Sequence, residues 1–275
     1  MRRASTSRPS RACERAIRGA TSGGSGSRCR SRSRVARVRI GTSGWVYQHW
    51  RGRFYPEKLA AARWFEFYAS RFDTVELNNS FYRQPSRKTF EGWRARSPVD
   101  FRFAVKLNRF VTHYKRLKVS AESIALSYDT MAGLGPKLAV VLAQLPPRMK
   151  FDAARLDGFL RAVARRRRRH ALEPRDASWL TDEALSALRR RRVALCVIDT
   201  PRWPSRIAVT ADFVYLRFHG PRGLYASNYS DGELRDWADR IRAWRDQDLD
   251  VFAYFNNDAN AYAVFNALRL RELVG

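Results

Sequence analysis

The stretch VELNNSFYRQPS, residues 75–86, decides how the rest of the chain is interpreted. It begins like a buried strand, yet Glu76 and Asn78 stand two positions apart, and side chains at that spacing leave the same face of a strand. On a buried face both groups need partners, because an unpaired amide in an apolar interior costs roughly 2–7 kcal/mol. The stretch therefore predicts that something compensates two polar groups at the end of a strand.

Apolar runs of strand length recur along the chain, with helical patterns between them. The expected strands are 38–43, 73–78, 101–108, 138–145, 171–175, 193–199, 212–219 and 250–256. Helical periodicity fills 58–71, 87–96, 120–132, 152–168, 180–191, 231–246 and 259–272. Strands that alternate with helices pair in parallel through right-handed crossovers. The pattern predicts an α/β fold, a (β/α)8 TIM barrel over 38–275.

Two details refine this fold prediction. The segment TPRWPSRIAVTA between the sixth and seventh strands holds two prolines and is too short for a full helix. We expect a loop to replace the helix there. An open doubly wound sheet is the alternative fold, but no glycine-rich phosphate-binding turn follows the first strand.

Residues 1–37 differ in composition from the rest of the chain. They are rich in Arg, Ser and Gly and lack apolar periodicity, so we expect a disordered tail. A start codon assigned upstream of the true one would also place such a stretch of sequence before the folded domain. Cys13 and Cys29 lie in this tail and Cys196 in an expected strand, which suggests no disulfide framework and a cytoplasmic protein.

Composition limits the partners of the protein without identifying one. The net charge is +27 and most basic residues are arginine, a bias that a GC-rich genome also produces, so charge alone does not establish anion binding. The longest clear apolar run, 138–145, is far shorter than the roughly 20 residues that span a bilayer, so we expect no membrane partner. The arginine runs at 165–170 and 189–192 end helices, and we expect them to be solvated on the barrel face opposite the strand ends.

Polar side chains gather where the expected strands end. Residues two positions apart in a strand point the same way, and five such couples occur at strand ends. They are Glu76 and Asn78, Lys106 and Asn108, Glu173 and Arg175, Arg217 and His219, and Tyr254 and Asn256. In TIM barrels the carboxyl ends of the strands form the active face, so these groups predict a site at that mouth. Glu76 or Glu173 would act as general acid or base, and His219 would transfer a proton or bind a metal. Lys106, Arg175 and Arg217 would hold an anion, and Asn78 and Asn256 would orient the substrate.

The loops expected at the same mouth suggest what the ligand is. GWVYQHWRGRFYP, NSFYRQPSR, RFVTHYKRLK and GPRGLYASNY mix aromatic residues with Arg and Lys and contain no acid. Such loops suit a small anionic or phosphorylated ligand, or a nucleic acid, with phosphates on the cations and flat groups on Trp45, Tyr47, Phe81, Tyr82 or Tyr225. Packing of these aromatic side chains within the loops is the competing interpretation.

Two other interpretations of the polar groups remain open. Glu76, Lys106, Glu173, Arg175 and Arg217 have a formal sum of +1, so they could form a paired ion network that only plugs the barrel. Glu76, Glu173, Asp199 and His219 could gather around a divalent cation, although no metal-binding motif indicates one.

Seven sequence blocks resemble one known family. They are GTSGWVYQHWRGRFYP, VELNNSFYR, FAVKLNRFVTH, LGPKLAVVLAQLPP, EPRDASW, YLRFHG and YFNND, and together they cover residues 38–275. In this order they resemble the YecE-like family, catalogued as a domain of unknown function, number seventy-two. The resemblance implies a TIM barrel and no established activity. It adds Tyr82, Trp179 and Asn257 to the candidate binding residues, with Ser80 standing where threonine is usual and Asp176-Ala177 preceding the Ser178-Trp179 pair.

Three functions follow from these residues. The first is a hydrolase or lyase acting on an anionic substrate that is related to nucleic acids, since no dinucleotide or haem signature points to redox chemistry. The second is a nucleic-acid-binding protein without catalysis, and the third is a barrel that binds a metabolite. The residues do not indicate the oligomeric state.

Overall fold

The computed structural model describes residues 35–164 and 166–275. Of the tail predicted over 1–37, residues 1–34 therefore lie outside the described residues. Arg37 is already part of the barrel edge, because its carbonyl accepts a hydrogen bond of 2.9 Å from the Val251 N–H.

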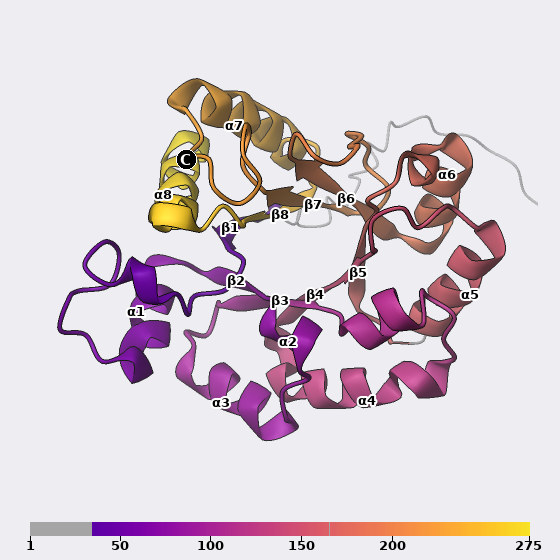
Figure 1. Ribbon diagram of the computed structural model, residues 1–275, viewed down its shortest axis with the longest axis horizontal. Helices are drawn as coiled ribbons and strands as arrows, with labels where there is room; N and C mark the ends of the chain where they lie inside the picture. The colour runs from indigo at the N-terminus through magenta and orange to yellow at the C-terminus, as the bar shows by residue number, and fades with distance from the viewer. Residues whose placement is uncertain (1–34, 165) are drawn as a thin grey trace, which may run out of the picture. The chain divides into compact units, whose positions relative to one another are not determined.

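Eight parallel strands form one sheet that curves into a nearly closed barrel (Figure 1). The strands are β1 (Val38–Thr42), β2 (Thr74–Leu77), β3 (Arg102–Lys106), β4 (Leu138–Gln144), β5 (Arg169–Glu173), β6 (Val193–Asp199), β7 (Phe213–Phe218) and β8 (Asp250–Phe255). Each strand pairs with the next along the chain from β2 to β8, and β8 pairs with β1. The predicted TIM barrel is confirmed.

The barrel closes between β1 and β2 through a side chain as well as through backbone. The only backbone pairing described there is an isolated bridge between Ser43 and Glu76. Below it, the buried Tyr68 hydroxyl accepts from the Thr42 N–H at 3.0 Å and donates to the Thr74 carbonyl at 3.1 Å. Gly41 faces the same seam, and a Cβ there would lie 2.4 Å from the Thr74 carbonyl oxygen. One tyrosine thus replaces a rung of the ladder between these strands.

Helices cover the outside of the barrel (Figure 1). They are α1 (Trp64–Arg71), α3 (Arg87–Arg96), α4 (Ala121–Met131), α5 (Ala153–Ala164), α6 (Asp182–Arg191), α7 (Asp231–Arg245) and α8 (Tyr262–Val274). The short α2 (Asn79–Tyr82) instead follows β2 at the carboxyl mouth, where its Phe81 contacts Lys106. Several begin at side-chain caps, as when Ser230 and Glu233 form a capping box at the start of α7. No helix lies between β6 and β7, so the predicted loop is confirmed.

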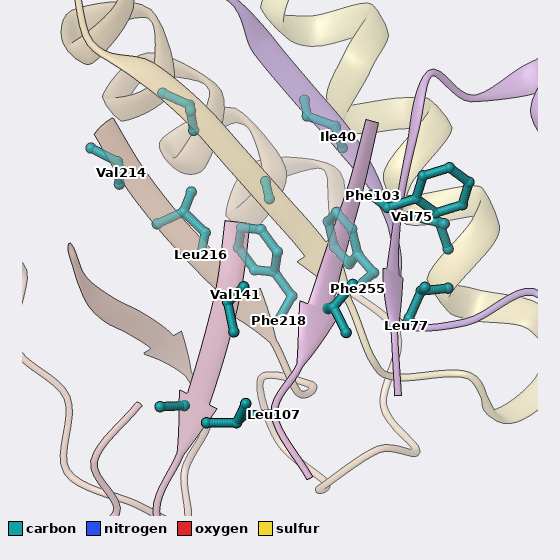
Figure 2. Close-up of a cluster of buried hydrophobic side chains, with 14 of the residues drawn as sticks. Ile40, Val75, Leu77, Phe103, Leu107, Val141, Val214, Leu216, Phe218 and Phe255 are labelled. Atoms are coloured by element: carbon teal, nitrogen blue, oxygen red, sulfur yellow. The ribbon is translucent and has the colours of Figure 1, made fainter. Parts of the chain in front are cut away.

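Strand alternation divides the apolar residues into two cores. Side chains that face the helices form the larger core, and Figure 2 shows part of it, including Val75 and Leu77 of β2 and Leu216 of β7. Side chains at the intervening positions, such as Leu142 and Tyr215, fill the barrel. This filling leaves the carboxyl mouth as the place where polar groups of several strands meet.

The two arginine runs differ in their surroundings. Arg189, Arg190 and Arg191 end α6 and are exposed, as expected. In the run at 165–170, Arg165 lies outside the described residues, and Arg167 and Arg168 are exposed as expected. Arg169 is only partly exposed, because β5 begins there, two residues earlier than predicted. The Arg169 guanidinium donates to the Asp250 carboxylate at 2.6 Å inside the amino end of the barrel. A salt bridge, rather than solvation, holds this cation.

Among the described helices, none combines the length and the apolar composition that a membrane span requires.

Candidate functional site

Arg217 is the centre of a buried charge cluster at the carboxyl ends of the strands. It lies near the end of β7 and is 1% exposed. Its Nη1 donates to Glu173 at 2.6 Å and its Nη2 donates to Glu76 at 2.7 Å, so one guanidinium joins β2, β5 and β7. The geometry is that of charge-assisted hydrogen bonds, which are short and strong.

Both glutamates are fully buried and have further donors. Glu76 accepts from the Ser43 hydroxyl at 2.6 Å and from the Tyr215 hydroxyl at 2.7 Å. Glu173 accepts from Arg175 Nε at 2.8 Å. These donors compensate the carboxylate that the opening stretch of sequence places on a buried face.

The Glu173 carboxylate stays ionised. Burial alone would raise its pKa, but Arg217 and Arg175 outweigh burial and hold the pKa well below the ordinary value for glutamate. A carboxyl group of this kind is a poor proton donor near neutral pH. Its geometry suits holding the two arginines in place better than it suits general acid catalysis.

Lys106, at the end of β3, completes the charged residues of the cluster. It is 8% exposed, and its Nζ lies 4.0 Å from the centre of the Phe81 ring. Burial lowers its pKa to about 7, and Arg217 adds to this effect while Glu173 and Glu76 oppose it. The amine is therefore a group that gains and loses a proton near neutral pH, unlike the arginines beside it.

His219 lies one residue beyond β7 and is fully buried. Burial, followed by the charge of Arg217, lowers its pKa well below the ordinary histidine value, so the ring is neutral. Its Nδ1 is 3.3 Å from Asn256 Nδ2, and Nε2 has no hydrogen-bond partner among the described residues. Nε2 is 3.9 Å from Glu173, which places this unpaired nitrogen beside the cluster.

Four candidate residues lie apart from the cluster. Asn78 follows the last residue of β2 in a helical conformation and lines a separate hollow between the first two strands and helices. Trp179 is buried and donates to the Met149 carbonyl at 2.6 Å, and Asn257 is buried and bonded to Asn266 and Ser227. Tyr82 is 69% exposed on α2, beside Phe81. Trp179 and Asn257 therefore hold loops together in this structure.

The cluster also includes side chains that the sequence analysis did not select. Ser43 and Tyr215 donate to Glu76. Ser43 lacks the G-x-S-x-G motif of a nucleophilic serine, and a tyrosine within a strand is common in any core, so neither residue was a candidate. His113 packs edge-on against Phe81 at 4.9 Å, and burial lowers its pKa to about 4. Trp203, in the loop without a helix, covers the Arg175 guanidinium at 3.7 Å. Two prolines and a short length marked that loop as unusual, but neither indicated a role for Trp203.

Of the four residues considered as metal ligands, Glu76, Glu173 and His219 lie in the cluster but Asp199 does not. Asp199 accepts from the Trp237 indole N–H at 2.7 Å on the outer side of the barrel, facing α7. Over the described ranges, no group of three or more His, Cys, Asp or Glu side chains is arranged to hold a metal ion.

Two hollows with basic walls lie among the loops at the mouth, and the first of them includes Arg175 of the cluster. The first measures about 640 Å³ and includes Arg148, Arg175, Arg202 and Trp203, with Asp176 as its acid. The second measures about 560 Å³ and lies between the loops after β3 and β4. Its charged residues are Lys115, Arg116, Lys118, Arg148, Lys150, Asp152 and Arg155. The hollows share Arg148, so basic residues extend over four neighbouring loops, those after β3, β4, β5 and β6.

Fold and site together define a class: a TIM barrel with a buried cluster of glutamates and cations at its carboxyl mouth. The family model described as "Protein of unknown function DUF72" matches residues 39–275, and the chain belongs to this family. The YecE-like resemblance is consistent with it.

Known relatives agree with this assignment. The chain is 30% identical to the UPF0759 protein YunF of Bacillus subtilis, with 86% of this chain and 94% of the relative covered. A crystal structure of a DUF72 family protein from Thermotoga maritima is 28% identical, with a TM-score of 0.76 over 86% of this chain and 99% of that chain. One from Enterococcus faecalis is 20% identical, with a TM-score of 0.74 over 86% and 95% of the two chains, and supports the fold alone.

Proposed function

We propose that the protein binds a small phosphorylated or otherwise anionic ligand at the carboxyl mouth and acts on it as a hydrolase or lyase. The first hollow carries this proposal, because three arginines line it and its acid, Asp176, is already engaged by Ser178 and Lys150. Arg148 and Arg202 have no acid partner among the described residues, and such cations beside an aromatic ring suit an anionic ligand with a flat group.

Arg175 connects the hollow to the cluster. Its Nε is bonded to Glu173 and its plane lies against Trp203, so the guanidinium has a fixed orientation. Within the described chain no hydrogen bond engages its two Nη groups. A phosphate oxygen in the hollow would satisfy them, which would place the ligand next to His219 and Lys106.

Proton transfer would then fall to the neutral nitrogens. His219 Nε2 is unpaired among the described residues, and the Lys106 amine titrates near pH 7, where an acid–base catalyst works best. Glu76 and Glu173 would hold Arg217 and Arg175 in position. The reducing cytoplasm expected from the cysteines suits the buried free thiol of Cys196.

Calorimetric titration with inorganic phosphate tests the binding step. The double variant Arg148→Gln/Arg202→Gln removes two exposed cations of the hollow and leaves the Glu173 cluster intact. Each lost charge-assisted bond is worth about 1.5–3 kcal/mol, so we expect affinity to fall at least about tenfold. The matched control Arg189→Gln/Arg190→Gln removes two exposed charges at the opposite face. Equal affinity in both variants would contradict the proposal.

Binding of a nucleic acid without catalysis is the second candidate. The observation that favours it is the second hollow, whose basic residues continue from Arg148 beyond the reach of one phosphate group. Binding of a single-stranded oligonucleotide would then fall steeply with salt, with a log–log slope of about −0.7 for each phosphate contacted. It would also survive Glu76→Gln and Glu173→Gln, whereas an enzyme would retain binding but lose turnover with these substitutions.

A further inference from the structure

Lys106 differs from every other lysine in the chain. All seven lysines lie in the described ranges, and Lys106 alone is buried. Among the described residues its Nζ has no hydrogen bond or ion pair, and its contact is with the face of Phe81 at 4.0 Å. A buried ammonium group without an anionic partner is unfavourable, so this position favours the neutral amine.

The groups around Lys106 leave it unpaired. The charged and titratable side chains that influence it, or that lie beside its Phe81 neighbour, come from β2, β5, β7 and the loop after β3. They are Glu76, Glu173, Arg175, Arg217, His219 and His113. Both carboxylates are already bonded to arginines, hydroxyl groups or both, and both histidines are neutral. After burial, Arg217 therefore opposes protonation of Lys106 more than either acid supports it, and Arg175 adds a smaller effect in the same direction.

A neutral amine in a buried site is a nucleophile toward carbonyl carbon. The Nζ lone pair would attack the carbonyl carbon of an aldehyde or ketone, and an N–H proton would pass to the oxygen to give a carbinolamine. Loss of water, which takes the second N–H proton and the former carbonyl oxygen, leaves an imine. The atoms balance without any further reactant.

We propose that Lys106 captures a carbonyl compound bearing a phosphate or carboxylate group as an imine, with the anionic group held in the hollow of Arg148, Arg175 and Arg202. This proposal rests on the proposed function and narrows its ligand to an anionic aldehyde or ketone. An imine withdraws electrons from the neighbouring carbon–carbon or carbon–hydrogen bond and so favours cleavage of that bond. The proposal therefore favours a lyase over a hydrolase.

Reductive trapping of the full chain tests the proposal. The protein is incubated with glycolaldehyde phosphate and sodium borohydride, and the modified lysines are located by peptide mass spectrometry. We expect Lys106 to carry most of the label, with at least tenfold more than exposed Lys88. Labelling of Lys106 should rise with a midpoint near pH 7, following its pKa of about 7. Unfolding the protein in urea should abolish this selectivity.

Two comparisons separate this inference from the proposed function. If inorganic phosphate binds the hollow but Lys106 is labelled no more than Lys88, the imine is refuted and anion binding stands. If uncharged glycolaldehyde labels Lys106 equally well and phosphate gives no protection, the imine stands and the anionic site is refuted. If Lys106 is labelled selectively and inorganic phosphate suppresses this labelling, the result supports both the imine and the anionic site. Because all arms use the unmodified protein, no variant has to fold.

Discussion

Replacing Arg217 is the most direct test of the charge cluster. The change Arg217→Met keeps a long side chain but removes the guanidinium that donates to Glu76 at 2.7 Å and to Glu173 at 2.6 Å. Both carboxylates are fully buried, so the variant retains two buried anions without their shared cation. Breaking a buried ion pair in this way costs about 3–5 kcal/mol, which we take as the expected loss of unfolding free energy at pH 7.

The loss should depend on pH in a defined direction. In the native protein the Glu173 pKa lies below its unfolded value of about 4.3, so the stabilisation is present above that pH and fades as the pH falls. Without Arg217, Arg175 is the main cation that opposes the effect of burial on the Glu173 pKa. That pKa should therefore rise above its unfolded value. The loss of unfolding free energy in the variant is then largest above that raised pKa, and it becomes smaller as the Glu173 carboxyl group is protonated. We expect a smaller difference from the native protein at pH 5 than at pH 7.

Urea denaturation followed by tryptophan fluorescence at pH 5 and pH 7 measures both effects. The triple variant Glu76→Gln/Glu173→Gln/Arg217→Met is the control, because removing all three charges together avoids an uncompensated anion. It should be more stable than Arg217→Met alone. A loss below about 1 kcal/mol at pH 7, typical of an exposed ion pair, would refute the assigned burial and pairing. A loss that does not change with pH would refute the titration argument.

Three further substitutions test the barrel itself, each by urea denaturation. Tyr68→Phe should cost at least about 1–3 kcal/mol, since it leaves the N–H of Thr42 and the carbonyl of Thr74 unpaired in the seam. Gly41→Ala should cost about 1–3 kcal/mol because its Cβ would meet backbone, whereas Gly232→Ala, with open space in α7, should stabilise by about 0.4–1 kcal/mol. Ser230→Ala should cost about 1 kcal/mol through loss of the α7 capping box, and an unchanged midpoint would show that the cap contributes nothing.

The period-two pattern predicted side-chain directions correctly inside the strands and failed just beyond some of them. Glu76, Lys106 and Arg217 precede or coincide with strand ends, and they meet at the mouth as expected. Asn78 comes one residue after β2, where φ of −95° and ψ of −23° turn the chain into α2. His219 also lies past its strand, but its N–H still bonds the Asp199 carbonyl at 2.9 Å and keeps the ladder geometry. Alternation therefore holds where the backbone pairing continues, and beyond the pairing it succeeds at some positions, such as Arg175, and fails at others, such as Asn78.

Other parts of the site depend on contacts that no local pattern contains. Trp203 reaches Arg175 from the loop between β6 and β7, and His113 reaches Phe81 from the loop after β3. A loop without a helix has no periodicity from which the direction of a side chain can be predicted. Trp179 and Asn257 show the converse, because their family motifs marked them, yet they bond loop backbone and a neighbouring helix. A motif residue can be retained for the fold of the loop that bears the site.

The two ends of the barrel allow the site interpretation to be weighed against a simple ion plug. At the amino end, Arg39 bonds Asp73 at 2.7 Å and Arg169 bonds Asp250 at 2.6 Å, so each of these guanidinium groups has its own acid. At the carboxyl end, by contrast, three basic side chains, Lys106, Arg175 and Arg217, share two glutamates.

The cations and the histidine at the carboxyl end include unpaired atoms. Among the described residues, Arg217 Nε and His219 Nε2 are buried without a hydrogen-bond partner, and Lys106 meets only an aromatic face. Each unpaired buried group costs about 1–3 kcal/mol, so a plug that served stability alone would pair these atoms, as Arg39 and Arg169 are paired at the amino end. Local rules of this kind are broken mainly at functional sites, where a ligand supplies the missing partner. Arg217 Nε is a donor without an acceptor, and an oxygen atom of the proposed anionic carbonyl ligand would provide one.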